Sequence, residues 1–190
     1  MATKVDKPFL TDVQTLRKRA RQHIAEGAVT ESYAGDPVIS CKLLNDALAT
    51  EIVCVLRYKA HYFMAKSIHA GPVKEEFLEH AGDEQRHADL IAERIEQLGG
   101  SPNLNPDGLH LRSATEYAAP NTLVEMIKED LIAERIAIDT YRELVSYFAK
   151  FDTTTRHMLE EIQGEEEGHA EDLADLLDHL PKELGGPGAR

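Results

Sequence analysis

The amino-acid sequence predicts an all-α protein in which four long helices form a bundle and a shorter helix precedes them. Three features of the sequence predict this fold. Apolar side chains recur at helical spacing over four long stretches. Glycine and proline cluster between these stretches and at the chain ends. Each stretch also places one glutamate among its apolar positions, and two of the stretches add a histidine three residues later.

Composition limits the class of protein. The chain has 190 residues, a hydrophobic content of 42% and a formal net charge of −13. One domain with a full core is therefore expected, and the acidity disfavours nucleic acid as the main partner. Residues 1–10 lack the apolar core of a signal peptide, and no stretch reaches the apolar length of a membrane span. We expect a soluble cytoplasmic protein with no membrane partner.

A short helix is predicted over residues 10–28, where Thr11 or Asp12 can cap the start and Gly27 can end it. Residues 29–37 are expected to be a linker. One face of this helix carries the only basic cluster of the acidic chain, Arg17, Lys18, Arg19 and Arg21. A solvated face is the plain interpretation, and DNA or a neighbouring subunit is the candidate partner.

The first bundle helix is predicted over residues 38–69. Its apolar face includes Leu48 and Val55, and Glu51 lies between them on that same face. Gly71-Pro72 is expected to end the helix, because proline cannot continue a helix and glycine readily caps one.

The second bundle helix is predicted over residues 72–98, with Glu84 in the middle of its apolar face. His87 follows one turn later and shares that face. Residues 99–120 are too long and too rich in proline and glycine for a tight hairpin. They are expected to cross along the bundle, so that the third helix runs parallel to the second. A short extra turn is expected within this crossover.

The third bundle helix is predicted over residues 121–150, and Glu134 interrupts its apolar face. The fourth is predicted over residues 152–180, where Asp152 or Thr153 can cap the start. Glu166 and His169 lie within its apolar face. The organisation expected from these elements is an N-terminal extension (1–37), a helical bundle (38–181) and a flexible tail (182–190).

The inward glutamates and histidines predict a metal centre. Glutamate is almost never buried unless it is paired or bound to something. Four carboxylates balance two divalent cations, and one imidazole completes each shell. Carboxylate and imidazole ligands favour iron or manganese. The expected ligands are Glu51, Glu84, His87, Glu134, Glu166 and His169.

Residues 40–180 resemble the bacterioferritins of the ferritin-like superfamily. The resemblance rests on Leu44-Asn45 ahead of Glu51, on Glu84-Gln85-Arg86-His87-Ala88-Asp89, on Glu134 followed by Tyr141-Arg142-Glu143, and on Glu165-Glu166-Glu167-Gly168-His169. It implies a ferritin-like four-helix bundle with two irons per chain at a ferroxidase site formed by the six residues, and manganese fits the same ligands. It further implies that Glu84 and Glu166 bridge the metals and that Glu51 and Glu134 are terminal carboxylates. Tyr58 and Asp83 match positions that support the ligands.

Three departures from the bacterioferritins bear on cofactor and assembly. Gln85 stands where those proteins have the methionine that binds haem between subunits, so no haem is expected there. The ten residues after Leu180 are too rich in proline and glycine for a fifth helix. The missing fifth helix and the N-terminal extension together resemble the Dps-type mini-ferritins, which form 12-subunit shells, and the related Dps-like proteins combine such a shell with a bacterioferritin-type site. A homo-oligomeric shell of 12 subunits is therefore favoured over one of 24.

The leading function implied is a ferroxidase that oxidises Fe(II) with O₂ or H₂O₂ and stores ferric iron in a hollow shell. Acidic residues along the second and fourth helices are candidates to line the cavity: Glu75, Glu76, Glu79, Glu160 and Glu161. The first alternative is a di-metal oxidoreductase without storage, such as a manganese catalase or a rubrerythrin-like peroxidase. The second is a DNA-protecting, Dps-like shell that acts through the basic N-terminal helix.

Overall fold

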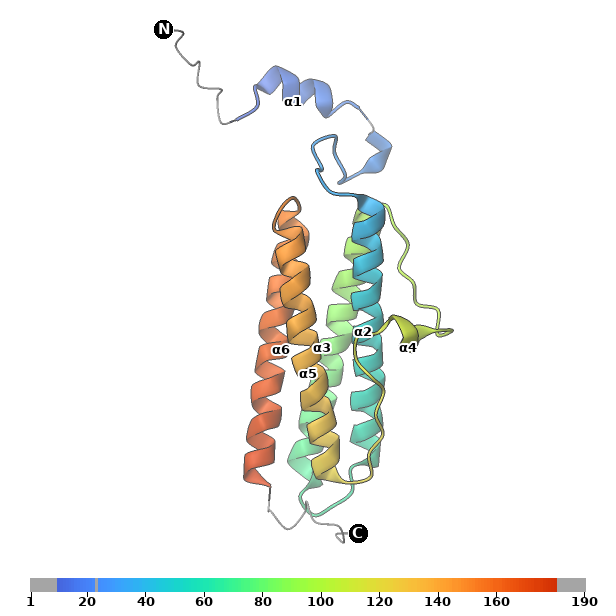
Figure 1. Cartoon of the computed structure of the whole chain (residues 1–190), viewed down its shortest axis with the longest axis vertical. Coiled ribbons are helices and arrows are strands. Elements are labelled where there is room, and N and C mark those ends of the chain that lie inside the picture. The colour runs from blue at the N-terminus through green and yellow to red at the C-terminus, as the bar shows by residue number, and fades with distance from the viewer. Residues whose placement is uncertain (1–9, 23, 181–190) are drawn as a thin grey trace.

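The computed structural model describes residues 10–22 and 24–180. Within them the chain is all-α, as predicted. Four long helices lie side by side as a bundle (Figure 1): α2 (Pro37–Met64), α3 (Ala70–Gln97), α5 (Leu123–Phe148) and α6 (Thr153–His179). The shorter elements are α1 (Val13–Arg19), a 3₁₀ turn (Ile24–Glu26) and α4 (Leu109–Arg112). No helix among the described residues is long and apolar enough to cross a membrane.

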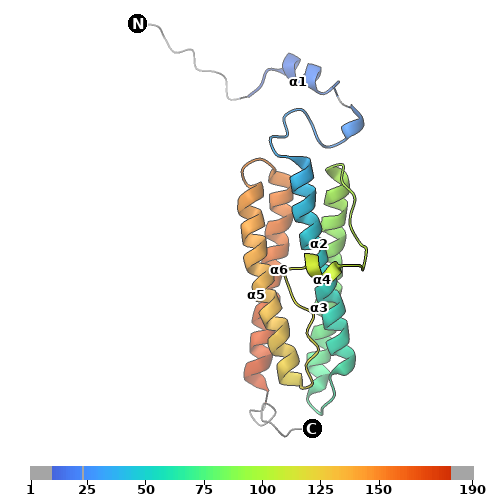
Figure 2. The ribbon, with the colours of Figure 1, turned by 45° about the vertical axis from the view of Figure 1, so that its right-hand side comes forward.

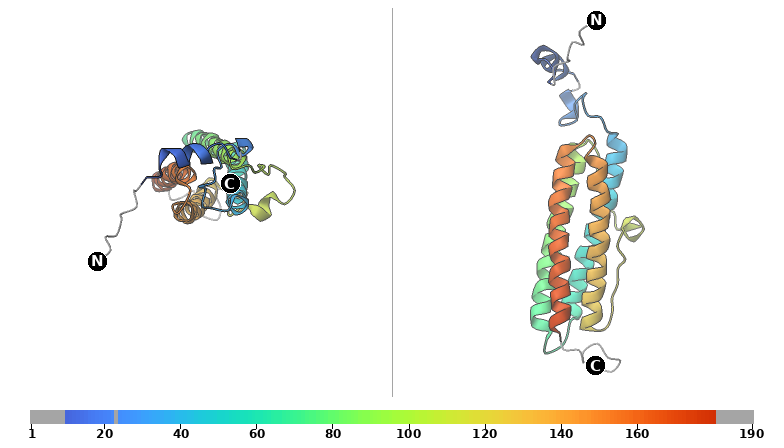
Figure 3. Two further views of the ribbon diagram at one scale, coloured as in Figure 1. Left: turned by 90° about the horizontal axis from the view of Figure 1, so that it is seen from above. Right: turned by 60° about the vertical axis from the view of Figure 1, so that its left-hand side comes forward.

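The crossover between α3 and α5 sets the topology. The chain leaves the top of α3, descends past α4 along the outside of α2 and enters α5 at the bottom (Figure 2). Consequently α5 runs parallel to α3, as predicted, and α4 is the expected extra turn. The closest packing is within the antiparallel pairs α2–α3 and α5–α6. Seen from above, the four long helices enclose one core, and the crossover lies outside it (Figure 3).

A buried ionic cluster attaches the crossover to the bundle. Arg57 Nε on α2 donates to Asp130 Oδ1 on α5 at 2.9 Å, and Arg57 Nη1 donates to the carbonyl of Glu116 at 2.9 Å. His61 Nδ1 lies 2.8 Å from Asp130 Oδ2, and its Nε2 lies 2.9 Å from the carbonyl oxygen of Ala118. Burial opposes the charge of Arg57, but neighbouring anionic groups raise the pKa of its guanidinium. The cluster therefore fixes α2 against both α5 and the end of the crossover.

A capping side chain begins α6, and glycine ends α3. The Asp152 carboxylate caps α6 by accepting from Thr155 N at 2.9 Å, as predicted, and also accepts from Arg94 Nη2 of α3 at 3.0 Å. At the end of α3, Gly99 has φ +80°, and Gly100 N donates to the carbonyl of Ile95. That backbone closure needs the left-handed conformation, which glycine adopts without strain.

The predicted boundary at Gly71-Pro72 was wrong. The first bundle helix ends at Met64, and Gly71 and Pro72 lie in the first turn of α3, which begins at Ala70. Proline is tolerated there because the first N–H groups of a helix have no intrahelical partner. The connection between α2 and α3 is therefore a short loop.

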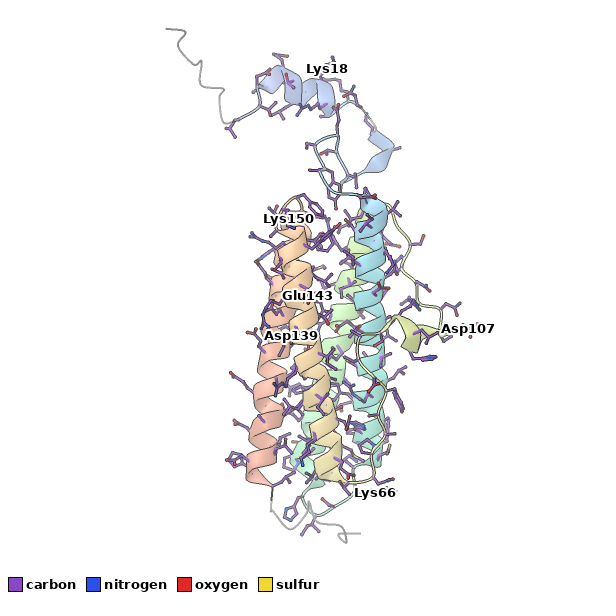
Figure 4. The ribbon with its side chains drawn as sticks, in the orientation of Figure 1. Lys18, Lys66, Asp107, Asp139, Glu143 and Lys150 are labelled. Carbon is purple, nitrogen blue, oxygen red and sulfur yellow. The ribbon has the colours of Figure 1, made fainter. Side chains whose placement is uncertain are left out.

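The N-terminal helix is shorter than the predicted span of residues 10–28. α1 covers seven residues and buries no side chain, and the carboxylate of Asp12 caps its start by accepting from Thr15 N at 3.0 Å. It lies beyond the end of the bundle where α2 begins, and Lys18 projects from it there (Figure 4). The apolar positions Val13 and Leu16 stay exposed, since no other element of the described residues covers them. The expected tail, 182–190, lies outside the described residues.

Two large apolar clusters with a polar layer between them fill the bundle, and a third, small cluster packs α4 against α2. One large cluster includes Leu44, Ile91 and Phe148, and the other includes Phe77, Ile127 and Leu173. One buried glutamate of each long helix lies along the bundle between these two large clusters: Glu51, Glu84, Glu134 and Glu166. This arrangement shields the polar layer at both ends of the bundle.

Candidate metal centre

Each long helix contributes one glutamate to the polar layer. Every one of these side chains is at most 1% exposed, and each lies among the apolar residues of its own helix, as the sequence pattern predicted. The four are Glu51 on α2, Glu84 on α3, Glu134 on α5 and Glu166 on α6. His87 and His169 follow one turn after Glu84 and Glu166 and are also buried. The structure thus brings all six predicted ligands together.

The six residues form two overlapping donor groups. In each group, one atom from every residue lies within 4.8 Å of the others. The first group is Glu51, Glu84, His87 and Glu166, and the second is Glu84, Glu134, Glu166 and His169. Since Glu84 and Glu166 belong to both groups, they lie where a carboxylate could contact two cations.

The spacing of the donor atoms suits metal coordination. His87 Nδ1 lies 3.1 Å from Glu166 Oε1 and 3.3 Å from Glu51 Oε2. His169 Nδ1 lies 3.4 Å from Glu166 Oε2 and 4.0 Å from Glu134 Oε2. Bonds of about 2.0–2.2 Å to one ion would hold its ligand atoms roughly 3–4 Å apart. Each group therefore has room for one ion.

Several buried polar atoms of the six residues have no hydrogen-bond partner in the part of the chain that the structure describes, and they show whether cations fit the site. Among the described residues, these atoms include Glu51 Oε2, Glu84 Oε1, Glu134 Oε2, both carboxylate oxygens of Glu166, and Nδ1 of His87 and His169. A buried carboxylate without a partner is costly. All seven atoms belong to the two donor groups. Two divalent cations would satisfy them together, so the residues fit a two-metal centre.

The crowding of buried carboxylates shifts their own pKa values and that of His87. Burial and the nearby Glu166 carboxylate raise the pKa of Glu84 and that of Glu134 well above the ordinary value. Burial also raises the pKa of Glu166. Burial opposes protonation of His87, but the neighbouring carboxylates of Glu166 and Glu51 raise its pKa overall. Without cations, protons compensate for the charge, and an arriving metal must displace them.

The outer nitrogen of each histidine faces a further carboxylate. His87 Nε2 lies 2.9 Å from Glu165 Oε2, and His169 Nε2 lies 3.5 Å from Asp83 Oδ2. Arg86 pairs with both of these carboxylates, and its hydrogen bond lowers the pKa of Glu165 to about 2. Such contacts direct Nδ1 of each ring toward the centre. Asp83 was predicted; Glu165 was not, although it precedes Glu166 as Asp83 precedes Glu84.

Two tyrosines hold carboxylates of the centre. The predicted Tyr58 donates its hydroxyl to Glu134. Tyr141 donates to Glu51 in the same way, although it entered the prediction only as part of the motif that follows Glu134. A signal was present, because Tyr58 follows Glu51 and Tyr141 follows Glu134 at the same interval of two helical turns. The two donors therefore cross between the helix pairs.

His80 is a further buried residue at the centre that sequence reasoning missed. It is 1% exposed, its ring stacks on that of His169 with centroids 4.0 Å apart, and its Nδ1 lies 3.2 Å from the Tyr58 hydroxyl oxygen. Burial, together with the charge of His169, lowers the pKa of His80 to about 3. Its position two helical turns before His87 could have indicated that it shares the inward face.

Known proteins resemble this chain in sequence and in fold. Residues 41–182 match the Ferritin family, described as a ferritin-like domain. A bacterioferritin of Mycobacterium tuberculosis is 32% identical over 154 residues, which cover 79% of this chain and 92% of that protein. The structure of a dodecameric thioferritin, a bacterioferritin-related protein of Bacteroides fragilis, is 32% identical, with a TM-score of 0.72 and coverage of 75% of this chain and 86% of that one. A ferritin-like diiron-carboxylate protein of Bacillus anthracis is 26% identical, with a TM-score of 0.67 and coverage of 76% and 99%.

Proposed function

The chain belongs to the ferritin-like family, and on that premise we propose that it is a ferroxidase that oxidises Fe(II) with O₂ or H₂O₂ and stores the ferric product in a hollow shell. The observation that supports this most is the set of buried donor atoms without partners on four helices. A purely structural core would not gather four carboxylates at one depth without cationic partners.

The proposal assigns three kinds of role to the six ligands. Glu51 and His87 hold one iron, Glu134 and His169 hold the other, and Glu84 and Glu166 lie between them. Two adjacent ferrous ions would supply two electrons to a single oxidant. Manganese fits the same donor types, so the native metal is part of what must be tested.

The remaining residues of the centre position these ligands. Tyr58 and Tyr141 each donate a hydrogen bond to a carboxylate oxygen and so hold Glu134 and Glu51 in one orientation. The apolar clusters on either side keep bulk water from the carboxylates. In such surroundings a fixed charge acts strongly on its neighbours, because few mobile dipoles screen it.

Storage requires a shell, and we propose 12 subunits. The dodecamer named for the Bacteroides fragilis relative supports this number. Large apolar side chains on the outside of α2, such as Leu56 and Phe63, are exposed in the single chain and are suitable for contacts between subunits. The absence of haem at Gln85 stays a prediction; this side chain is exposed and donates to Asp89 at 3.0 Å.

Iron loading in air tests the proposed function. The protein receives Fe(II) in large excess and is desalted, and iron per chain is counted beside the mass of the assembly. Many irons per chain on a large shell is the expected result. About two per chain on a small assembly would instead favour an oxidoreductase without storage. Fewer than one per chain would contradict the iron site itself. A Glu84→Gln, Glu166→Gln variant is the matched control that removes the two shared carboxylates.

A further inference from the structure

A second cluster of metal-ligating side chains lies beside the centre. His80 Nε2 is buried and has no hydrogen-bond partner among the described residues. It points toward Glu76 Oε1 at 3.2 Å and Asp172 Oδ2 at 3.9 Å. One donor atom from each of these three residues lies within 4.8 Å of the others, so that one ion could contact all three. None of the six proposed ligands of the centre belongs to this group.

The hydrogen bonds of His80 determine which ring nitrogen is free. Tyr58 has one hydroxyl hydrogen and donates it to Glu134, so its oxygen can only accept from His80 Nδ1. The hydrogen of the neutral imidazole is therefore on Nδ1, and Nε2 presents a lone pair. A lone pair that faces two carboxylates is repelled by them unless a cation lies between.

No basic side chain supplies that cation within the described part of the chain. Neither Glu76 nor Asp172 forms an ion pair there with a lysine or an arginine, and each instead lies close to His80 Nε2. Bonds of about 2.0–2.2 Å to one ion would produce donor separations close to those observed. An imidazole with two carboxylates selects a divalent transition metal over calcium or magnesium, which prefer oxygen ligands alone.

We propose that Glu76, His80 and Asp172 bind a third divalent metal ion, through which ferrous iron passes between the protein surface and the two-metal centre. Side-chain exposure falls along this route, from 57% at Asp172 to 29% at Glu76 and 2% at His80. Beyond His80 the stacked ring of His169 follows directly. The transfer role rests on the proposed ferroxidase function, whereas the binding of the third ion does not.

Counting Co(II) ions per chain under anaerobic conditions tests the site. We expect three per chain in the unaltered protein, two in Glu76→Gln, Asp172→Asn, and three in the control Glu79→Gln, Glu171→Gln. The control removes the same charge from exposed positions on the same two helices. Crystals soaked in Zn(II) should show an anomalous peak between Glu76, His80 and Asp172. Two ions per chain in the unaltered protein, with no such peak, would overturn the site.

A variant of the two-metal centre tests the third site independently of the proposed ferroxidase function. In Glu84→Gln, Glu166→Gln, one Co(II) per chain should remain and should disappear when Glu76→Gln and Asp172→Asn are added. If the third site does not bind metal, the unaltered protein should hold two Co(II) ions, and the binding of both should weaken in Glu84→Gln. If the two-metal centre does not bind metal, the unaltered protein should hold one ion, the one bound by Glu76 and Asp172.

The transfer role has a separate test: the initial rate of Fe(II) uptake should fall several-fold in Glu76→Gln, Asp172→Asn. An unchanged rate after loss of the third ion would overturn the transfer role.

Discussion

The hydroxyl of Tyr58 on α2 donates a hydrogen bond to the carboxylate of Glu134 on α5, so that a ligand on one helix pair is held by a side chain of the other. The hydroxyl of Tyr141 on α5 likewise donates a hydrogen bond to the carboxylate of Glu51 on α2. The two contacts link the helix pairs at the depth of the candidate centre. They make the position of each terminal carboxylate depend on how the pairs are packed.

Removing either hydroxyl should weaken metal binding. In Tyr58→Phe or Tyr141→Phe, the carboxylate loses its donor and gains freedom to rotate, and we expect the affinity for Co(II) to fall by about 10- to 100-fold. Absorbance titration of the metal-free protein measures this. Tyr147→Phe is the matched control, because Tyr147 packs on Phe148 and Phe151 and is not part of the centre. Equal affinities in all three variants would show that the tyrosines do not hold the ligands.

The stability of the metal-free protein should fall as pH rises from about 5 to about 8. The folded chain raises the pKa of Glu84 and of Glu134, and the pKa of His87 is raised as well. The pKa of His80, lowered to about 3, acts in the opposite direction, but the three raised groups outweigh it. In this range the folded state therefore binds more protons than the unfolded state, and losing them costs stability. Urea unfolding at several pH values measures the trend. A metal-free protein that gained stability over this range would contradict the raised pKa values.

Bound metal should reverse that trend. Metal displaces the protons from the centre, so stabilisation by Co(II) should grow as pH rises over the same range. The same unfolding series with and without Co(II) gives the difference directly. A Glu84→Gln, Glu166→Gln variant should lose most of it, because two of the titrating carboxylates are gone.

The ionic cluster behind the crossover should be costly to break. Asp130→Ala leaves the buried Arg57 and His61 without their shared carboxylate, and we expect a loss of about 3–5 kcal/mol in the free energy of unfolding. Asp139→Ala is the control, since this side chain lies on the outside of α5 (Figure 4) and is 78% exposed. Its replacement should change the free energy by no more than about 0.5 kcal/mol. Similar losses in both variants would indicate that burial of the cluster is not the cause.

The basic face of α1 should bind DNA if the chain has a role in protecting it. Arg17, Lys18 and Arg19 occupy the last turn of α1, which buries no residue. Replacing the three with glutamine should reduce the slope of log affinity against log salt by roughly two to three. Replacing Lys59, Lys66 and Lys150, which are exposed on other helices and loops, removes the same charge elsewhere. Gel-shift titrations at several salt concentrations compare the two variants, and equal slopes would rule out α1 as the contact.

Helical periodicity was sufficient to predict the bundle and the six candidate ligands. Glu84 and His87 share a face with the apolar residues of their own helix, so their burial follows once that face is buried. The same reasoning overestimated the helix over residues 10–28. No residue of α1 is buried against the rest of the described chain, and without such packing only the short α1 and a 3₁₀ turn form. The division into extension, bundle and tail stays a prediction.

By itself, the sequence determined which side of each helix faces inward, because that depends only on the spacing of residues along one helix. Tertiary structure alone decided which atoms meet across the bundle. Tyr141 reaches Glu51 over a separation of 90 residues, and His80 stacks on His169 while facing Asp172. Such contacts depend on how far each helix is rotated and shifted against its neighbours. That rotation and shift are set by the packing of all four helices together, and no single helix encodes them.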